Sequence, residues 1–430
     1  MEESNVLDAG TVWMVTSAAM VLLMTPGLAI FYGGMTRAKS SLNMIMMSFV
    51  SMGLVGVVWV LWVHGMTGGD GWAGVVGNPA GDLGLTGTMA EGGLVAAAYG
   101  ATFAIIAVAL ISGAVADRFK FVTWCVFVPV WTTVVYAPLA YMVWGGGLLS
   151  ADGAIGARLG EALDFAGGLV VHISAGVAAL VLALLLGKRH GFGVDPGHRP
   201  HNVPFTMLGA ALLWFGWFGF NGGAAGGVDE LGLIWVDTLA AGAAGMLGWV
   251  FVEWLRRGRP TSIGTASGIV SGLVAITPAC AYVSPLGAVV IGLVSGAASA
   301  LAVNLKYRLG FDDSLDVVGV HLTAGILGTV LIGFFALPSE GPAGLFYGGD
   351  GRLLLAQTVA VLVAVVFTAV VTTAIALVLR GTMGLRVSKE DEERGVDLTL
   401  HDESAYHYDV GFGGVPVPAD AQAHRGGAAG

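Results

Sequence analysis

Two stretches of the chain share one pattern: Asp164-Phe-Ala-Gly-Gly-Leu-Val-Val-His172-Ile-Ser-Ala-Gly and Asp313-Ser-Leu-Asp-Val-Val-Gly-Val-His321-Leu-Thr-Ala-Gly. In each, an aspartate precedes a histidine by eight residues, and the histidine lies in an apolar run. A titratable side chain inside a membrane span is expensive, so it usually marks an ion or proton path. Two such histidines in two parts of one chain suggest a pathway on an axis of internal symmetry.

The composition is that of a polytopic membrane protein. Of 430 residues, 56% are hydrophobic and 11% are charged, whereas a soluble protein carries roughly 25% charged residues. The 69 glycines agree with this class, because small residues are enriched where transmembrane helices pack closely. The net charge of −10 and the lack of a basic stripe argue against nucleic acid as a partner. Because Met1-Glu-Glu-Ser-Asn5 has no positive charge, we expect a retained first span and not a signal peptide.

Eleven segments are long and apolar enough to be spans, since crossing a bilayer takes about 20 mainly apolar residues. The predicted spans are 11–33, 42–64, 92–115, 121–143, 166–187, 203–226, 231–255, 263–280, 285–305, 316–337 and 353–380.

The basic residues set the predicted orientation. All of the 19 lysines and arginines except Arg158 and Arg352 follow odd-numbered spans. Cytoplasmic loops carry the excess of positive charge, so the N-terminus is predicted to lie outside and the C-terminus inside. The predicted outer loops are acidic instead. That acidity either raises the local concentration of cations or reflects only a solvated face without positive charge.

The shared pattern predicts an inverted repeat. The histidines fall in spans five and ten, and a repeat of five spans must be inverted because its second copy starts on the opposite side of the membrane. A weaker pair, Phe31-Tyr-Gly-Gly34 and Phe220-Asn-Gly-Gly223, agrees with this. The sequence therefore predicts an all-α membrane protein with eleven transmembrane helices, an inverted five-helix repeat and one extra helix. The predicted units are a membrane domain over 1–380, with repeats at about 11–187 and 203–337 and the extra helix at about 353–380, and a short, solvated cytoplasmic tail over 381–430.

These motifs together resemble those of the Amt/Rh family of ammonium transporters, on the bacterial and plant Amt branch, over about residues 11–408. The matching motifs are Gly27-Leu-Ala-Ile-Phe-Tyr-Gly-Gly34, Met142-Val-Trp-Gly-Gly-Gly-Leu148, Asp164-Phe-Ala-Gly-Gly168 with His172, Trp217-Phe-Gly-Phe-Asn221, Thr277-Pro-Ala-Cys280 and Asp316-Val-Val-Gly-Val-His321. The resemblance implies eleven spans, a homotrimer in the lipid bilayer of the cell membrane, and one pore per subunit.

The resemblance implies an outer site where ammonium is recruited. Trp144 and Phe103 match its aromatic residues, whose ring faces attract a cation by about 0.5–2 kcal/mol each. Trp144 also fits the aromatic belt at a membrane interface. Ala224 stands where the family often has serine, so one hydroxyl acceptor is missing and recruitment is expected to be weaker. Asp164 is expected both to cap its helix and to favour a nearby cation by its charge. Asp316, which matches the motif before the second histidine, is interpreted as structural.

Below the outer site, the resemblance implies a gate and a lumen. Phe103 and Phe220 match a pair of stacked rings that closes the pore. His172 and His321 match twin histidines, which burial keeps uncharged and which offer one donor and one acceptor nitrogen each. With no carboxylate or thiolate beside them, a metal site is not expected. Other residues that match positions along the path are Trp217, Tyr136, Phe31 and Tyr32.

We therefore expect a transporter of ammonium or ammonia, with no cofactor and no enzymatic activity. The deprotonated substrate crosses as ammonia, and the proton either stays outside or travels separately along the histidines. One alternative is an ammonium sensor that signals through a cytoplasmic partner, and the resemblance implies a PII-type signalling protein at the C-terminal face. Setting the resemblance aside, a proton-coupled transporter of another small amine is the remaining alternative.

Overall fold

The computed structural model describes residues 7–194 and 199–406 as a bundle of helices. Within these residues, ten helices are long and apolar enough to cross a membrane, and an eleventh apolar helix, α12, is shorter. Ten of the predicted spans are thus matched by helices of sufficient length. The span predicted over 263–280 contains α12 and the turn after it. The outermost residues, including the ends of the predicted tail at 407–430 and of the N-terminus at 1–6, lie outside the described residues.

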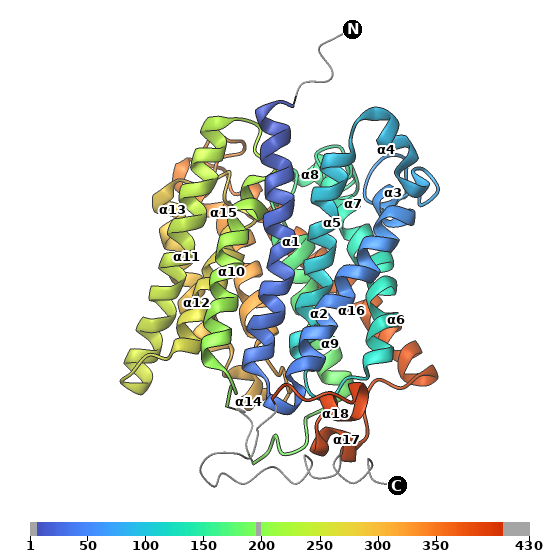
Figure 1. Cartoon of the computed structure of the whole chain (residues 1–430). Helices are drawn as coiled ribbons and strands as arrows, with labels where there is room; N and C mark the ends of the chain where they lie inside the picture. Colours follow the sequence, from blue (N-terminus) through green and yellow to red (C-terminus); the bar gives the residue numbers. More distant parts are fainter. Residues whose placement is uncertain (1–6, 195–198, 407–430) are drawn as a thin grey trace, which may run out of the picture.

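The long helices run up and down through the bundle (Figure 1). In chain order they are α1 (Ala9–Met35), α2 (Ser41–Val58) continued by η3 (Trp59–Val63) and α3 (His64–Met66), α5 (Leu94–Ile111) with η5 (Ser112–Val115), α6 (Phe121–Trp131) continued by η6 (Thr132–Tyr136) and α7 (Ala137–Trp144), η7 (Gly168–Ile173) with α9 (Ser174–Leu186), α10 (Val203–Gly222), α11 (Val228–Arg257), α12 (Ser262–Ile276), α13 (Pro285–Ala302) with α14 (Leu305–Leu309), η8 (Val318–Leu322) with α15 (Thr323–Phe335), and α16 (Arg352–Thr382).

Short polar side chains begin several of these helices. Asp8, Asn202, Thr261 and Ser284 each accept a hydrogen bond from a backbone N–H three residues later. Such a cap satisfies one of the N–H groups that a helix leaves unpaired in its first turn. The α12 helix ends at Ile276, just before Pro278, and its 15 residues are about 22 Å long. It is therefore shorter than the roughly 30 Å hydrocarbon core.

Two pairs of helices cross closely and in opposite directions. Along α1 and α10, Gly34 lies against Thr206 and Gly219 lies against Ser17, so the residue numbers run oppositely. A Cβ added at Gly209, in between, would lie 2.5 Å from the backbone nitrogen of Phe31. The two histidine segments, η7 with α9 and η8 with α15, are related in the same way, because Gly176 lies against Leu322 and Gly325 lies against Ile173. Glycine permits these approaches because it has no side chain to separate the backbones.

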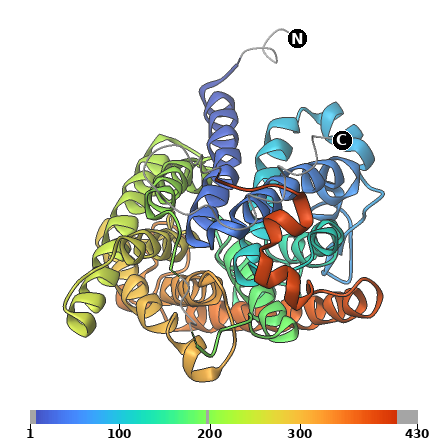
Figure 2. The same cartoon turned by 60° about the horizontal axis from the view of Figure 1, so that its bottom comes forward.

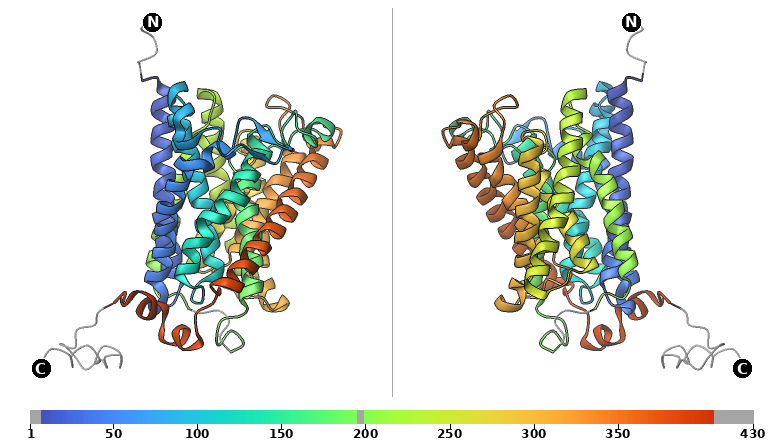
Figure 3. Two further views of the ribbon diagram at one scale, coloured as in Figure 1. Left: turned by 90° about the vertical axis from the view of Figure 1, so that its right-hand side faces the viewer. Right: turned by 90° about the vertical axis from the view of Figure 1, so that its left-hand side faces the viewer.

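Small elements cover the two ends of the bundle. At the end where α1 begins lie the antiparallel strands β1 (Gly71–Trp72) and β2 (Val76–Gly77) and the helices η4 (Leu83–Leu85), α4 (Thr86–Glu91), α8 (Gly156–Leu159) and η9 (Leu345–Tyr347). At the other end lie η2 (Ala38–Ser40), α17 (Lys389–Arg394) and α18 (Val396–His401). Figure 3 shows α16 inclined relative to α1 on one side of the bundle.

The segment after α16 is folded against the bundle, and not solvated as the sequence predicts. Figure 2 shows α17 and α18 lying across the end of the bundle that carries them. Glu392 is buried, forms an ion pair with Arg386 at 2.7 Å, and accepts the backbone N–H of His190. Asp397 accepts the N–H groups of Leu42 and Asn43 in the first turn of α2. For the described residues 385–406 the prediction of a solvated tail was wrong. The sequence Lys389-Glu-Asp-Glu-Glu-Arg394 is uniformly polar, but the groups that pair with the buried acids of this segment lie elsewhere in the chain.

Candidate functional site: a histidine pair beneath stacked phenylalanines

Both histidines lie in π-helical turns, and the fold brings them together. His172 lies in η7 and His321 in η8, and both side chains are buried. Their Nδ1 atoms are 3.3 Å apart, and the rings are stacked at 24° with centroids 5.4 Å apart. Single π-helical turns inside α-helices are frequent at functional sites. The Nδ1–Nδ1 contact requires one ring to donate and the other to accept.

The aspartates of the two stretches have the same structural role. Asp164 accepts hydrogen bonds from four consecutive backbone N–H groups, those of residues 167–170, at 2.5–3.2 Å. Asp313 accepts the N–H groups of Val317 and Val318 at 3.1 and 2.8 Å. Burial raises the pKa of Asp164 to about 6, although its four N–H donors favour the charged form. The capping role predicted for Asp164 is therefore confirmed, and Asp313 repeats it in the second half of the chain.

The two phenylalanines predicted as a gate are in contact. The rings of Phe103 on α5 and Phe220 on α10 are stacked at 15° with centroids 4.2 Å apart, and both are buried. Tyr99 fixes this arrangement, since its hydroxyl donates to the carbonyl oxygens of Gly219 and Phe220 and its ring packs edge-on against Phe103 at 4.8 Å. Sequence reasoning missed Tyr99. Its spacing of four residues from Phe103 on one helix was the available signal.

Trp144 borders this pair at the end of α7. Its side chain is 42% exposed, its ring lies edge-on to Phe103 at 6.3 Å, and its indole N–H donates to the Asp164 carbonyl oxygen at 2.7 Å. Trp144 and Asp164 also line a surface depression of about 480 Å³. Ala224 is exposed in the turn after α10, next to Gly223, whose Cα lies against the Tyr99 ring. Trp144 thus contacts the stacked phenylalanines, Asp164 is hydrogen-bonded to Trp144, and Ala224 follows a residue that lies against Tyr99.

A small apolar cavity, of about 10 Å³, lies beside the histidines. This is about the space that one water-sized molecule needs. The Nε2 atom of His172 is buried there and has no hydrogen-bond partner among the described residues. The cavity is lined by Met24, Leu28, Phe31, Ile106, Leu110, His172, Leu213, Trp217, Phe220, Val270 and His321.

Trp217 forms one wall of this cavity. Its ring stacks on His172 at 21° with centroids 5.5 Å apart, and its indole N–H donates to the Thr277 hydroxyl at 2.8 Å. Thr277 was quoted from the sequence as part of a motif, but its role as the partner of Trp217 was not predicted. Tyr32 and Tyr136 do not line the cavity. The Tyr32 hydroxyl donates to the Leu110 carbonyl oxygen, and Tyr136 is buried within η6.

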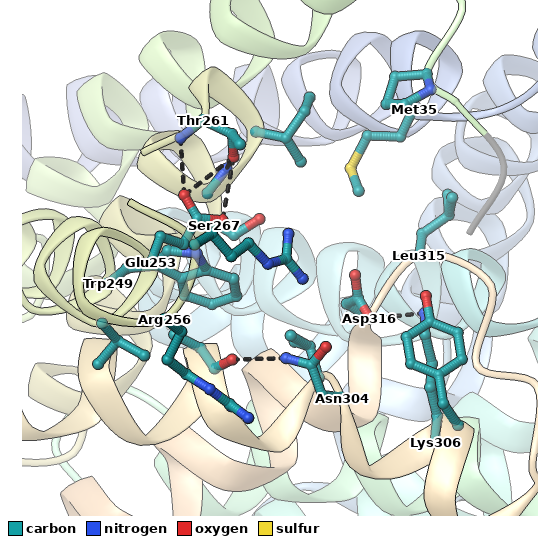
Figure 4. Close-up of a pocket in the computed structure, with 18 of the residues that line it drawn as sticks. Met35, Trp249, Glu253, Arg256, Thr261, Ser267, Asn304, Lys306, Leu315 and Asp316 are labelled. Carbon is teal, nitrogen blue, oxygen red and sulfur yellow. Dashed lines mark hydrogen bonds and ion pairs between the residues drawn. The ribbon is translucent and has the colours of Figure 1, made fainter. Parts of the chain in front are cut away.

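A wider pocket of about 470 Å³ is lined by Met35 at the end of α1, by Lys306 in α14 and by residues of α11 and α12 (Figure 4). On α1, Leu28 and Phe31 line the small cavity and Met35 lines the pocket, at helical spacing. On α12, Val270 lines the cavity and Ser267 lines the pocket, one turn apart. The same helix faces therefore lead from the histidines to the pocket. Asp316, interpreted from the sequence as structural, borders this pocket and forms an ion pair with Lys306 at 2.7 Å.

Stacked aromatic rings above a small apolar cavity, inside a bundle of membrane-spanning helices, define a membrane transport protein for a small solute. A model described as the Ammonium Transporter Family matches residues 12–406. An ammonium transporter of Mycobacterium tuberculosis is 48% identical over 96% of this chain and 94% of that protein, and one of Aquifex aeolicus is 45% identical over 93% and 94%. The chain belongs to the ammonium transporter family, and it is a multi-pass protein of the cell membrane.

Solved structures agree with this assignment. A structure titled "Sensor Amt Protein" matches with a TM-score of 0.84 and 28% identity, over 91% of this chain and 98% of that one. Saccharomyces cerevisiae Mep2 matches with a TM-score of 0.79 and 33% identity, over 89% and 88%. The fold is therefore the one adopted by Amt and Mep proteins.

Proposed function

We propose that this protein recruits ammonium at the outer site formed by Trp144, Phe103 and Asp164 and conducts ammonia past His172 and His321. The proton that ammonium loses there either returns to the outer solution or travels separately along the two histidines. The observation that carries the proposal is the order of the groups: an exposed tryptophan, two stacked phenylalanines, and then a histidine pair in a cavity. The ring faces and the Asp164 carboxylate attract a cation, whereas the apolar cavity beyond them disfavours one. Ammonium that loses its proton at this boundary continues as the neutral molecule.

The histidine pair suits ammonia as a ligand. When the two Nδ1 atoms share one hydrogen, one ring keeps an Nε2–H donor and the other keeps an unprotonated Nε2 acceptor. Ammonia has one lone pair and three N–H bonds, so it pairs with both. The two tautomers exchange when a proton binds the bare Nε2 of one ring, the shared hydrogen crosses the Nδ1–Nδ1 contact of 3.3 Å, and a proton leaves the Nε2 of the other ring. The same pair therefore serves a neutral pathway and a proton-carrying one.

The finer architecture is part of the proposal. Counting α12 as a span gives eleven, and the opposed pairs α1–α10 and α9–α15 support an inverted repeat over about 11–187 and 203–337, with α16 as the extra helix. The basic residues favour an outer N-terminus and a cytoplasmic C-terminus. A homotrimer with one pore per subunit, and a PII-type signalling protein that binds the C-terminal face, follow from the family resemblance.

An ammonium pulse applied to proteoliposomes tests the transport mechanism. We expect a saturable response in the parent protein that is lost in the His172→Ala/His321→Ala double variant and kept in His64→Ala, which changes a histidine of the outer end. An inward current would assign the proton to the histidine route. Alkalinisation of the lumen without current would assign a neutral ammonia path. No response of either kind in a folded protein would contradict transport.

A second candidate function is ammonium sensing. The match to a protein titled "Sensor Amt Protein" favours it. The folded segment Leu385–Tyr406 also favours it, because this segment contacts α2 and the residues before α10 and could carry a change in the bundle to a partner. If sensing is the function, ammonium changes the binding of a PII-type protein while transport is negligible. Removing the residues after Arg380 tests whether this segment is needed for that binding.

A further inference from the structure

Asp237 is a buried acid that the transport path does not use. It lies in α11, ten residues into a helix of membrane-spanning length, and its exposure is 0%. Neither carboxylate oxygen has a hydrogen-bond partner among the described residues. An ionised carboxylate without partners is very costly in an apolar interior. A titratable group at such a place is by default a candidate functional site.

Every other buried acid in the described part of the chain has partners. Asp164, Asp313 and Asp397 accept backbone N–H groups, whereas Asp117, Asp312 and Glu392 pair with arginines. Charge-assisted bonds of these kinds stabilise the ionised form. Asp237 has neither kind of partner, so its surroundings favour the uncharged acid.

Asn221, which is hydrogen-bonded to the residue after Asp237, also has a buried oxygen without a donor in the described part of the chain. Asn221, also fully buried, donates through Nδ2 to the Thr238 hydroxyl at 2.9 Å, and Thr238 is the next residue after Asp237. The Thr238 hydroxyl is itself used, since it donates to the Ile234 carbonyl oxygen at 2.7 Å. The Oδ1 atom of Asn221 is therefore left without a donor. Asp237 and Asn221 together have three buried acceptor oxygens that lack a donor among the described residues.

We propose that Asp237 is a proton-binding site, at which the carboxyl holds one proton and donates it toward the Oδ1 atom of Asn221. One proton converts the carboxylate to the neutral acid and supplies the missing donor, so it removes the buried charge and satisfies an orphan acceptor at once. A proton also needs no cavity, in contrast to a metal ion or ammonium. The proposal rests on these contacts alone and does not depend on the proposed transport function.

The proposed proton-binding site at Asp237 is connected to the gate through Asn221. Asn221 directly follows the gate residue Phe220 in α10. The proposed acceptor and the gate residue therefore lie in the same turn of α10.

Infrared difference spectroscopy of the full chain in lipid vesicles at pH 7 tests this inference. We expect the parent to show a carboxylic-acid carbonyl band that shifts in heavy water and is missing in Asp237→Asn, whose amide also supplies a donor. The matched control is Asp229→Asn, an exposed acid in the first turn of the same helix, which removes a carboxylate band instead. In Asn221→Ala the acid band is expected to remain and to move to the position of a free acid.

Two results would overturn the proposal. Loss of a carboxylate band in Asp237→Asn would mean that the group is ionised. If that band also moved when sodium in the buffer was replaced by ammonium, the ligand would be a cation and not a proton. An acid band that does not move in Asn221→Ala would contradict the assignment of Asn221 as the acceptor, and this variant keeps the test decisive if Asp237→Asn fails to fold.

Discussion

At the scale of residues, the number of N–H donors around a buried acid decides what that acid can do. Asp164 is surrounded by four backbone N–H groups and can hold a negative charge next to Trp144. Asp237, without a donor, cannot do so at a comparable cost. Asp164 and Asp237 thus differ in the charge that they can carry, because backbone N–H groups surround the one carboxylate and not the other.

The charge of Asp164 predicts a pH dependence of transport. Burial raises the folded-state pKa of Asp164 from 3.8 to about 6. The protonated form of Asp164 therefore contributes to the stability of the fold, and this contribution is lost as the pH rises from about 4 to about 6.

The negative charge of Asp164 that attracts ammonium depends on pH in the opposite direction, because it is present only after the acid has lost its proton. Between external pH 7 and pH 5, the charged fraction falls about tenfold, and we expect methylammonium uptake to fall similarly. Asp164→Asn should be slow and insensitive to pH over this interval, and an equally steep profile in that variant would contradict the assignment.

A hydroxyl introduced at position 224 is expected to raise the affinity of the outer site for ammonium. A serine hydroxyl at this position adds an acceptor for ammonium, and a net hydrogen bond contributes about 0.5–1.5 kcal/mol. We therefore expect Ala224→Ser to lower the KM for methylammonium uptake by about two- to twelve-fold, with kcat little changed. Ala225→Ser, which changes the next residue, is the control. Equal KM values in Ala224→Ser and the parent would show that the hydroxyl does not reach the substrate.

Much of the site could be predicted from the sequence because its key residues lie in local motifs. His172 and His321 have similar flanking residues, and their Nδ1 atoms are 3.3 Å apart in the structure. Tyr99, Thr277 and Asp237 were missed, since the partners or the lack of partners that define them depend on helices far away in the chain. No short sequence pattern reports whether a buried polar atom finds a donor.

At the scale of elements, close helix crossings depend on glycine. A Cβ at Gly209 would lie 2.5 Å from the backbone nitrogen of Phe31, so α1 and α10 must separate to admit it. We expect Gly209→Ala to destabilise the protein by about 1–3 kcal/mol and to lower its thermal unfolding temperature in detergent. Gly53→Ala, where nothing lies within 4 Å, is the matched control. An unchanged unfolding temperature in Gly209→Ala would mean that the crossing is looser than described.

The elements themselves differ in how well sequence predicts them. Ten of the eleven spans predicted from apolar runs are helices of span length among the described residues, because apolar length is what a bilayer selects. The helix α12 ends sooner than predicted because Thr277-Pro278 begins a turn whose carbonyl groups accept the N–H groups of Phe165 and Ala166. The π-helical form of η7 and η8 was not predicted either, since a change from four- to five-residue hydrogen bonds leaves no mark on hydropathy.

At the scale of the whole molecule, the charge bias predicts which end faces outward. Glu340 and Ser404 are exposed residues from an acidic loop and from the segment after α16. In oriented cells, a membrane-impermeant maleimide should label Glu340→Cys from outside and should label Ser404→Cys only after the membrane is opened. The parent, whose Cys280 is buried and whose Cys125 lies within α6, is the control for background. The reverse pattern would invert the proposed orientation.

The segment Leu385–Tyr406 also has a consequence for the order of assembly. It pairs with the loop between α5 and α6 through Leu385 and Val387, with α2 through Asp397, and with the residues before α10 through Tyr406. Because a ribosome synthesises this segment after α16, those loops stay unclosed until the helices from α1 to α16 have been made. A chain truncated after α16 would leave without a partner the loop groups that this segment satisfies, such as the backbone N–H of His190, which donates to Glu392. The contacts of this segment therefore distinguish a chain that has all of these helices from a shorter one.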